Sequence, residues 1–225
     1  MIRSVWPFVA VLWLAGGGPG LTQRGTAQTV QIAEWQSAVD GDEGRALTLI
    51  EAARARTRIG EIYDPAYVAI AYPGGDVPDD RGVCSDVVIR AYRAIGIDLQ
   101  VRVHEDMRAN FAHYPSLWGL TRTDRNIDHR RVPNLETYFQ RQGAALPVSQ
   151  GVAVYRPGDL VTWRLPGNLP HIGIVSDRIT PGGVPLILHN IGVGTVEEDV
   201  LFAWPVTAHF RYFPAAGGEG GARRR

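Results

Sequence analysis

The sequence predicts an α+β fold in which helices come first and an antiparallel sheet follows. Apolar residues recur at helical spacing from Cys84 to Ile95, which indicates an amphipathic helix. From Pro157 onward the pattern changes to short apolar runs separated by Pro-Gly turns, which is typical of strands. The connections between these runs are short, and short connections join antiparallel neighbours.

Composition places the chain among ordinary globular proteins. It has 225 residues, of which 45% are hydrophobic and 20% are charged, so it can enclose a substantial core. Its formal net charge is zero. We therefore expect neither nucleic acid nor an anionic membrane surface as its main partner.

Residues 1–27 have the pattern of an export signal. Arg3 precedes an apolar run from Val5 to Ala15, and Gly25-Thr26-Ala27 offers small residues at a cleavage position. The run is shorter than the ~20 residues that span a bilayer. We expect cleavage near Gln28, no stable membrane insertion afterwards, and a periplasmic or extracellular protein. The alternative is an uncleaved anchor.

Residues 28–62 are expected to form two helices ahead of a catalytic domain at 63–214, and the tail 215–225 is expected to be disordered. The first helix runs from Gln28 to Val39, and Asp40 caps the second with Glu43 in capping-box position. The elements expected next are a strand at Tyr67–Tyr72, the helix Cys84–Ile95 ended by Gly96, an extended piece at Ile97–Val103, a helix at Glu105–His113, a long loop at Tyr114–Arg131, and a helix capped by Asn134 and ended by Gly143. The strands expected after Pro157 are Leu160–Arg164, Ile172–Asp177, Pro185–His189 and Ala208–Phe213.

Cys84 is the only cysteine of the chain and stands where its helix should begin. A thiol in the first turn meets unpaired N–H groups and the positive end of the helix dipole, which favour the thiolate. Its own backbone N–H is a natural oxyanion donor. The alternative interpretation is a small, buried and inert side chain.

Two histidines lie at strand boundaries in the second half. His171 opens the run His171-Ile172-Gly173-Ile174, and His189 ends the apolar run before Asn190. Neighbouring strands lie about 4.8 Å apart. His171 can therefore act as base for Cys84, with His189 or Asn190 orienting the imidazole.

These residues carry a resemblance to a known family. The segments around Cys84, Gly158-Asp159, His171 and His189-Asn190 resemble the motifs of the NlpC/p60 cell-wall cysteine peptidases, a papain-like superfamily. More closely, the chain resembles the bacterial family called domain of unknown function 1287 (DUF1287), which is grouped with those peptidases. The closer match is carried by Tyr72–Pro78, Asn126–Leu135 and His189–Gly192.

The resemblance implies a papain-like NlpC/p60 core, with an antiparallel sheet and a packed N-terminal helix that carries the cysteine. It implies that Cys84 is the nucleophile, that His171 is the base, and that the third polar residue, His189 or Asn190, orients the base. One departure concerns specificity. The wider group has Asp before the cysteine and Ser-Gly after it, whereas this chain has Val83 before and Ser85-Asp86 after.

Further polar residues are candidates for substrate binding. They are Tyr72, Asp76, Asp128, His129, Arg130 and Asn190. Either Arg130 or Arg131 can bind a peptide carboxylate in bidentate fashion, or the segment 124–131 satisfies itself through internal ion pairs. A metal at Asp124, Asp128, His129 and His104 lacks paired-ligand spacing. We therefore expect no metal and no cofactor.

We therefore expect an exported cysteine-dependent amide hydrolase that acts on the peptide stems of peptidoglycan or on a related peptide. The alternatives are a thiol acyltransferase that uses the same residues, and a non-catalytic module that binds the cell envelope. The sequence leaves the scissile bond and the oligomeric state open.

Overall fold

The computed structural model describes residues 41–214. Residues 41–56 are helical, and a two-stranded parallel ladder pairs β1 (Ile62–Tyr63) with β2 (Arg81–Gly82). Three helices follow: α2 (Cys84–Ala94), α3 (Leu99–Ala109) and α4 (Val132–Arg141). Short 3-10 turns occupy Phe111–His113, Asp128–Arg130, Val152–Val154 and Pro166–Asn168.

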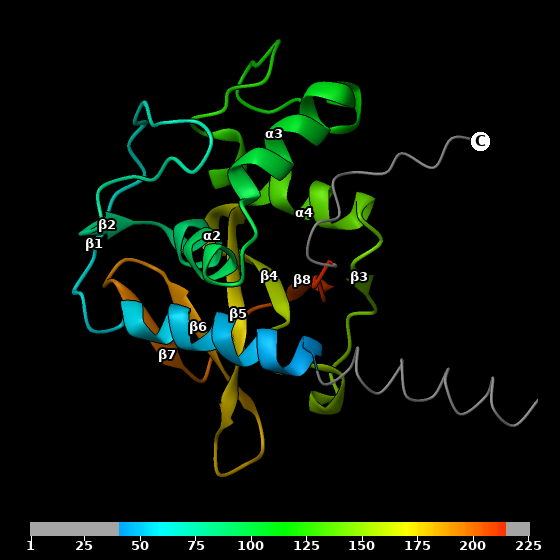
Figure 1. Ribbon diagram of the computed structural model, residues 1–225. Coiled ribbons are helices and arrows are strands. Elements are labelled where there is room, and N and C mark those ends of the chain that lie inside the picture. Colours follow the sequence, from blue (N-terminus) through cyan, green and yellow to red (C-terminus); the bar gives the residue numbers. More distant parts are fainter. Residues whose placement is uncertain (1–40, 215–225) are drawn as a thin grey trace, which may run out of the picture. The chain divides into compact units, whose positions relative to one another are not determined.

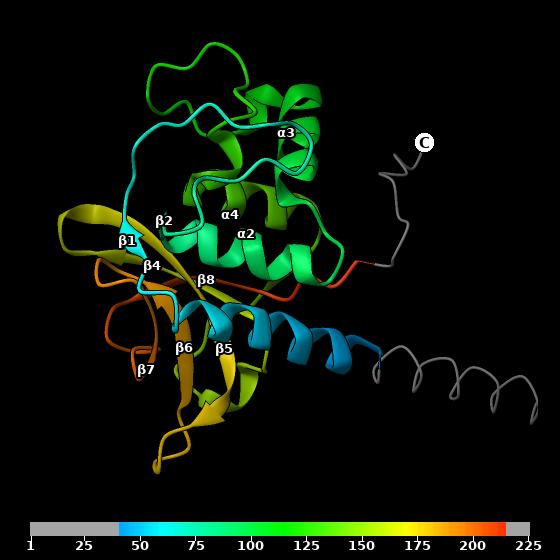
Figure 2. The same cartoon turned by 60° about the vertical axis from the view of Figure 1, so that its left-hand side comes forward.

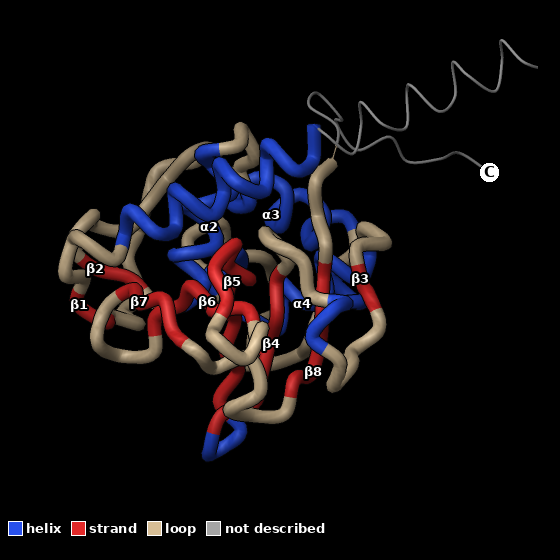
Figure 3. Tube along the Cα trace, turned by 90° about the horizontal axis from the view of Figure 1, so that it is seen from below, coloured by secondary structure: helices blue, strands red, loops and turns tan. Residues whose placement is uncertain are grey.

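The second half forms an antiparallel sheet in the order β3-β8-β4-β5-β6-β7 (Figures 1 and 3). Its strands are β3 (Ala145–Leu146), β4 (Leu160–Leu165), β5 (Leu169–Ile179), β6 (Pro185–Asn190), β7 (Thr195–Glu198) and β8 (Val206–Phe210). The long central strand β5 lies between β4 and β6. Its residue His171 pairs with Trp163 of β4, and its residue Ile174 pairs with Leu188 of β6.

Helices cover one face of this sheet, as Figure 2 shows most clearly. The side chains of Val87, Val88 and Tyr92 on α2 are buried against Ile172 and Ile174 of β5. Leu49, Ile50 and Ala53 of the helix at 41–56 belong to the same cluster. Full burial of a large apolar side chain stabilises the folded state by about 1.5–3 kcal/mol, so this face is the main source of stability.

The opposite face of the sheet holds a smaller apolar cluster. Residues alternate along a strand, so Val161 and Trp163 point away from the helices. Trp163 is fully buried, and its indole N–H donates to the carbonyl of Leu201 at 3.0 Å. The His171 ring packs against Trp163 of this second cluster.

The structure confirms the α+β class, the antiparallel sheet and a helix that begins at Cys84. The strand expected at Tyr67–Tyr72 is wrong, because this stretch is irregular. The extended piece expected at Ile97–Val103 is also wrong. Asp98 caps α3 there by accepting from the N–H groups of Gln100 and Val101.

Asn134 is not a helix cap. It lies inside α4 and its amide donates to the carbonyl of Asp128 at 3.0 Å. The export signal at 1–27, the helix at Gln28–Val39 and the tail at 215–225 lie outside the described residues. Within residues 41–214, no helix combines the length and apolar character needed to cross a membrane.

Candidate active site

The cysteine stands at a corner that is fixed by polar contacts. Cys84 is the first residue of α2, and Val83 before it is extended. The Asp86 carboxylate accepts the N–H of Val83 at 2.7 Å, and the Ser85 hydroxyl donates to the carbonyl of Arg130 at 2.7 Å. Asp86 therefore satisfies an N–H at the helix start, while Ser85 ties the helix to the segment Asp128–Arg130.

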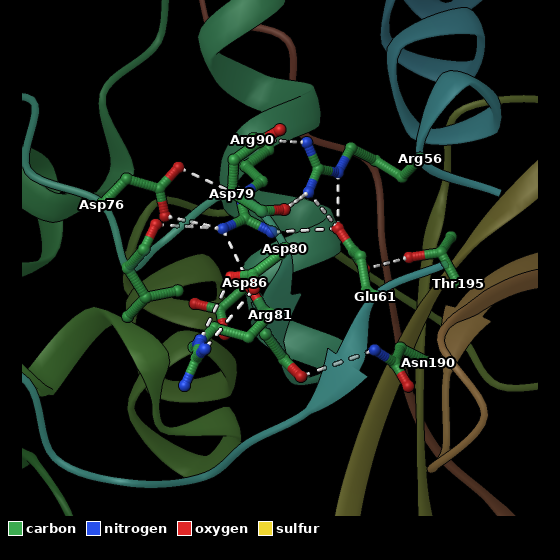
Figure 4. A network of polar contacts seen from close by, with 12 residues as sticks. Arg56, Glu61, Asp76, Asp79, Asp80, Arg81, Asp86, Arg90, Asn190 and Thr195 are labelled. Carbon is green, nitrogen blue, oxygen red and sulfur yellow. Dashed lines mark hydrogen bonds and ion pairs between the residues drawn. The ribbon is translucent and has the colours of Figure 1, made fainter. Parts of the chain in front are cut away.

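A buried carboxylate ties the same corner to the sheet (Figure 4). Glu61 accepts from Arg56 Nε at 2.5 Å, from Arg90 Nη1 at 3.0 Å and from the Thr195 hydroxyl at 2.7 Å. Arg90 belongs to α2 and Thr195 to β7, so one carboxylate joins the cysteine helix to the sheet edge. Such a network holds α2 in a set position against the sheet edge.

Cys84 is almost buried but lines a cavity. The cavity has a volume of about 370 Å³, and Cys84 is 5% exposed. The backbone N–H of Ile172 on β5 faces the sulfur and favours the thiolate. Burial raises the pKa of the thiol to about 11, although this N–H lowers it. The helix start therefore does not produce the lowered pKa that the sequence predicts, because loss of water is the larger effect.

The two histidines form a continuous chain with a carboxylate. Nε2 of His171 lies 2.8 Å from Nδ1 of His189, and Nε2 of His189 lies 3.0 Å from Oε1 of Glu198. An ionised carboxylate only accepts hydrogen bonds, so His189 carries its proton on Nε2 and presents Nδ1 as an acceptor. His171 must then donate from Nε2, which leaves its Nδ1 without a proton.

This assignment of protons follows from the hydrogen-bond chain, and it has a chemical consequence. Nδ1 of His171 carries a free lone pair and forms no hydrogen bond within residues 41–214. Burial lowers the pKa of His171 to about 3, with a smaller contribution from His189. The imidazole is therefore neutral at rest and available as a base.

Gly173 makes room for the histidine pair. A Cβ at this position would lie 2.5 Å from Cγ2 of Ile187 and 3.2 Å from Cβ of His189. Only glycine lets β6 approach β5 closely enough here. Trp163 and Trp204 flank the His171 ring at 5.7 and 6.4 Å between centroids, so the ring lies among aromatic walls.

The thiol and the imidazole are neighbours without touching. The sulfur meets the N–H of Ile172, the residue after His171, yet no hydrogen bond joins Cys84 to His171 within the described part of the chain. Pro170, the residue before His171, lines the Cys84 cavity, and neither histidine does. At rest the pair is a neutral thiol beside a neutral imidazole.

Of the candidate substrate-binding residues, the structure places Arg130 in the lining of the Cys84 cavity. Its guanidinium is held by Asp86, with Nε 2.8 Å from Oδ1 and Nη2 2.9 Å from Oδ2. Asn190 lies next to His189 but turns elsewhere. Its amide donates to the carbonyl of Gly82 at 3.4 Å, and its carbonyl oxygen accepts from Gly192.

Tyr72 and Asp76 do not line the cavity. The Tyr72 hydroxyl lies 3.5 Å from the Glu105 carboxylate. Asp76 accepts from Arg90 Nε at 3.0 Å and from Arg93 Nη1 at 2.8 Å. These contacts give Asp76 a structural role at the loop before β2.

Asp128 and His129 are buried and do not line the cavity. Oδ1 of Asp128 and Nδ1 of His129 have no hydrogen-bond partner. Burial disfavours the charged form of both groups: it raises the pKa of Asp128 to about 6 and lowers that of His129 to about 3, so that His129 is neutral near pH 7. No group of three His, Cys, Asp or Glu side chains within residues 41–214 is arranged to hold a metal.

Sequence reasoning missed several residues of the site. Glu198 ends β7, a strand that was not expected, so its carboxylate had no predicted neighbour. The cavity wall also includes Tyr63, Tyr67 and Trp118. The Tyr67 hydroxyl donates to Asp124 at 3.0 Å and accepts from the Asn126 amide at 2.7 Å. The dense polar sequence at 124–128 was the one signal for this wall.

Comparisons with known proteins identify the family. A family model described as "Domain of unknown function (DUF1287)" matches residues 50–212. The "Uncharacterized protein YijF" of Escherichia coli (strain K12) is 59% identical over 161 residues, covering 71% of this chain and 78% of that protein.

A solved structure titled "Structure of NlpC1 from Trichomonas vaginalis" is 16% identical, with a TM-score of 0.40. The match covers 74% of this chain and 44% of that one, and a likeness at this TM-score carries no argument about fold or activity. The family match rests instead on the model that spans most of the described residues. The chain belongs to the DUF1287 family.

Proposed function

We propose that this protein is a cysteine-dependent amide hydrolase. Cys84 is the nucleophile, His171 the general base and His189 the residue that orients it. One observation carries the proposal. The only thiol of the chain lies at a helix start on a cavity, against the strand that bears a neutral histidine with a free Nδ1.

The chemistry starts with proton transfer. In the proposed step, Nδ1 of His171 takes the thiol proton as the sulfur of Cys84 attacks the substrate carbonyl. Catalytic hydrogen bonds often form only in the substrate complex, so their absence at rest is compatible with this step. The Cys84 N–H donates to the developing oxyanion.

The second half returns the proton. The imidazolium of His171 protonates the leaving amine, the C–N bond breaks, and a thioester forms at Cys84. Water then attacks the thioester while His171 accepts its proton. The carboxylic acid leaves, and the thiol recovers its proton from His171.

The proposed substrate is the peptide stem of peptidoglycan, and the proposed location is the periplasm or the cell exterior. Two sequence features support both parts: the signal-like pattern of residues 1–27 and the resemblance of the cysteine and histidine motifs to cell-wall peptidases. N-terminal sequencing of the exported protein should begin near Gln28. Recovery of intact Met1-starting protein from the cytosol would remove the argument for this substrate.

Purified muropeptides, incubated with the protein and examined by mass spectrometry, test the activity. Hydrolysis of one amide bond per stem in wild type, with no products from Cys84→Ala, supports the proposal. A parallel incubation with an added amine separates hydrolysis from acyl transfer, because a transferase yields the amide of that amine in excess over the acid. Unchanged muropeptides after incubation with folded wild-type protein would count against the proposal.

A further inference from the structure

Two adjacent arginines beside the thiol have opposite surroundings. The Arg130 guanidinium is buried and bound in bidentate fashion by Asp86. The Arg131 guanidinium forms no hydrogen bond and no ion pair within residues 41–214, and its Nη1 is buried without a partner. Of the two residues that can bind a carboxylate, the fold uses one and leaves the other unpaired.

Arg131 is held in place by an aromatic ring. Its guanidinium carbon lies 4.2 Å from the centroid of Trp118, within the range of a cation–π contact. Trp118 has φ +60°, an uncommon conformation for a residue with a large side chain. Such strain persists where the surroundings enforce it, often at ligand sites. The contact holds the guanidinium over the ring, while Nη1 stays buried without a hydrogen-bond partner.

Both residues line the cavity that contains Cys84. Trp118 also lines a second cavity of about 650 Å³, and the two cavities share Pro133 and Pro170. A substrate bound in the Cys84 cavity therefore lies beside the Arg131–Trp118 pair. The cavity places this unpaired cation in contact with the space that the scissile peptide would occupy.

The charge of Arg131 is poorly compensated by the protein itself. Burial lowers the pKa of Arg131, while Asp128 and Asp124 act against this shift. Burial raises the pKa of Asp128 to about 6, which makes this carboxyl easier to neutralise than an ordinary one. A planar guanidinium with free N–H groups is the side chain best suited to a carboxylate, which it binds through two parallel hydrogen bonds.

We propose that Arg131, stacked on Trp118, is the specificity-determining subsite of this enzyme and binds a carboxylate on the peptide substrate. The inference rests on the proposed hydrolase function and names the chemistry that the site selects. A peptide with a free carboxylate near the scissile amide is preferred over the same peptide with a carboxamide there. The carboxamide offers one acceptor and brings an N–H₂ group toward the cation.

The test uses two synthetic γ-linked glutamyl tripeptides that differ only in this group, free acid or carboxamide. For wild type, kcat/KM should be about 10- to 100-fold higher for the acid, as expected for a charge-assisted bidentate contact. Arg131→Gln should bring the ratio close to one, mainly through a higher KM for the acid. Arg131→Lys should restore part of it, because lysine supplies the charge without the fork.

Arg122→Gln is the matched control. Arg122 is exposed in the same loop and lines neither cavity, so removing its charge should leave the ratio unchanged. Wild-type hydrolysis with equal kcat/KM for both peptides, or an unchanged preference in folded Arg131→Gln, would overturn the subsite.

Calorimetric binding of the two peptides to full-length Cys84→Ala separates this inference from the proposed function. Preference for the acid, lost in Cys84→Ala/Arg131→Gln, supports the subsite even if wild type cleaves neither peptide. Equal binding of both peptides, or binding of neither, contradicts it. If wild type still cleaves the peptides in that case, the hydrolase proposal holds and the subsite proposal fails.

Discussion

His171 Nε2 and His189 Nδ1 lie 2.8 Å apart in a buried pair that ends on Glu198. Because Glu198 accepts a hydrogen bond from Nε2 of His189, the chain of hydrogen bonds leaves Nδ1 of His171 unprotonated. The carboxylate is half exposed, yet it decides which nitrogen of a buried ring can act as base. Glu198 is therefore a positioning residue.

Glu198→Gln should be more harmful than Glu198→Ala. A glutamine amide can donate to Nε2 of His189, which moves the proton of His189 to Nδ1 and that of His171 to Nδ1, the wrong nitrogen. We expect a loss in kcat of about 10- to 100-fold for Gln, less than the ~10⁴-fold seen where a fully buried orienting residue is neutralised. In Glu198→Ala, water can replace the carboxylate and His189 can adopt either tautomer, so the loss in kcat should be smaller.

Steady-state kinetics on muropeptides checks this order. Asp199→Asn is the matched control, because Asp199 is an exposed neighbour that forms no contact with the pair. Equal rates for Glu198→Gln and wild type would show that Glu198 does not set the tautomer.

The thiol should be a weak nucleophile toward small reagents in the resting protein. Burial raises the pKa of Cys84 to about 11, and the neutral His171 supplies no charge to lower it. The rate of iodoacetamide labelling should therefore still rise above pH 9, beyond the range of a free thiol with pKa ~8.5. His171→Ala should leave this profile nearly unchanged. A labelling rate that levels off below pH 7 would reveal a preformed thiolate–imidazolium pair.

Arg130 should matter for stability before it matters for substrate. Its ion pair with Asp86 is buried on both sides, and loss of one partner leaves an uncompensated buried charge. Arg130→Met should lower the free energy of unfolding by about 3–5 kcal/mol. Urea denaturation measures this loss. The double variant Asp86→Asn/Arg130→Met should recover part of it, and additive losses would show that the pair is not coupled.

His129 should make the fold sensitive to acid. Its folded pKa of about 3 lies below the unfolded value of ~6.5, so the unfolded chain binds more protons between these limits. Its contribution to stability therefore falls as pH drops from 6.5 toward 3. Asp128, with a pKa raised to about 6, acts in the opposite sense, since its contribution is lost as pH rises through 6.

Comparison with His129→Leu isolates the histidine, because the Asp128 contribution is common to both proteins. Between pH 6 and pH 4, the unfolding free energy of wild type should fall more steeply than that of the variant by up to about 1.4 kcal/mol per pH unit. Urea titrations at several pH values give both slopes. Parallel slopes would contradict a neutral buried His129.

The regions that the sequence predicted well are those with strong local patterns. The helix at Cys84 and the strands at β4, β5 and β6 have clear periodicity and turns, and they carry the thiol and both histidines. The stretch at Tyr67–Tyr72 misled because its residues favour strands, yet it finds no partner strand and is held by side-chain contacts such as Tyr67 with Asp124.

What the sequence did not reveal depends on three-dimensional neighbours. The position of Cys84 in a first turn predicted a lowered pKa, but burial reversed the direction, and burial is a property of the packed fold. Arg130 and Arg131 are adjacent and chemically identical. Only the presence of Asp86 beside one and Trp118 beside the other separates their roles.

Hydrolysis of purified muropeptides by folded Cys84→Ala and Cys84→Ser, measured beside wild type, tests the central claim most directly. No other residue at this site can form the thioester, and a serine hydroxyl is far less acidic, so both variants should lose activity by at least about 1,000-fold. Circular dichroism should match that of wild type in each case. Wild-type rates in folded Cys84→Ala would contradict the thiol mechanism.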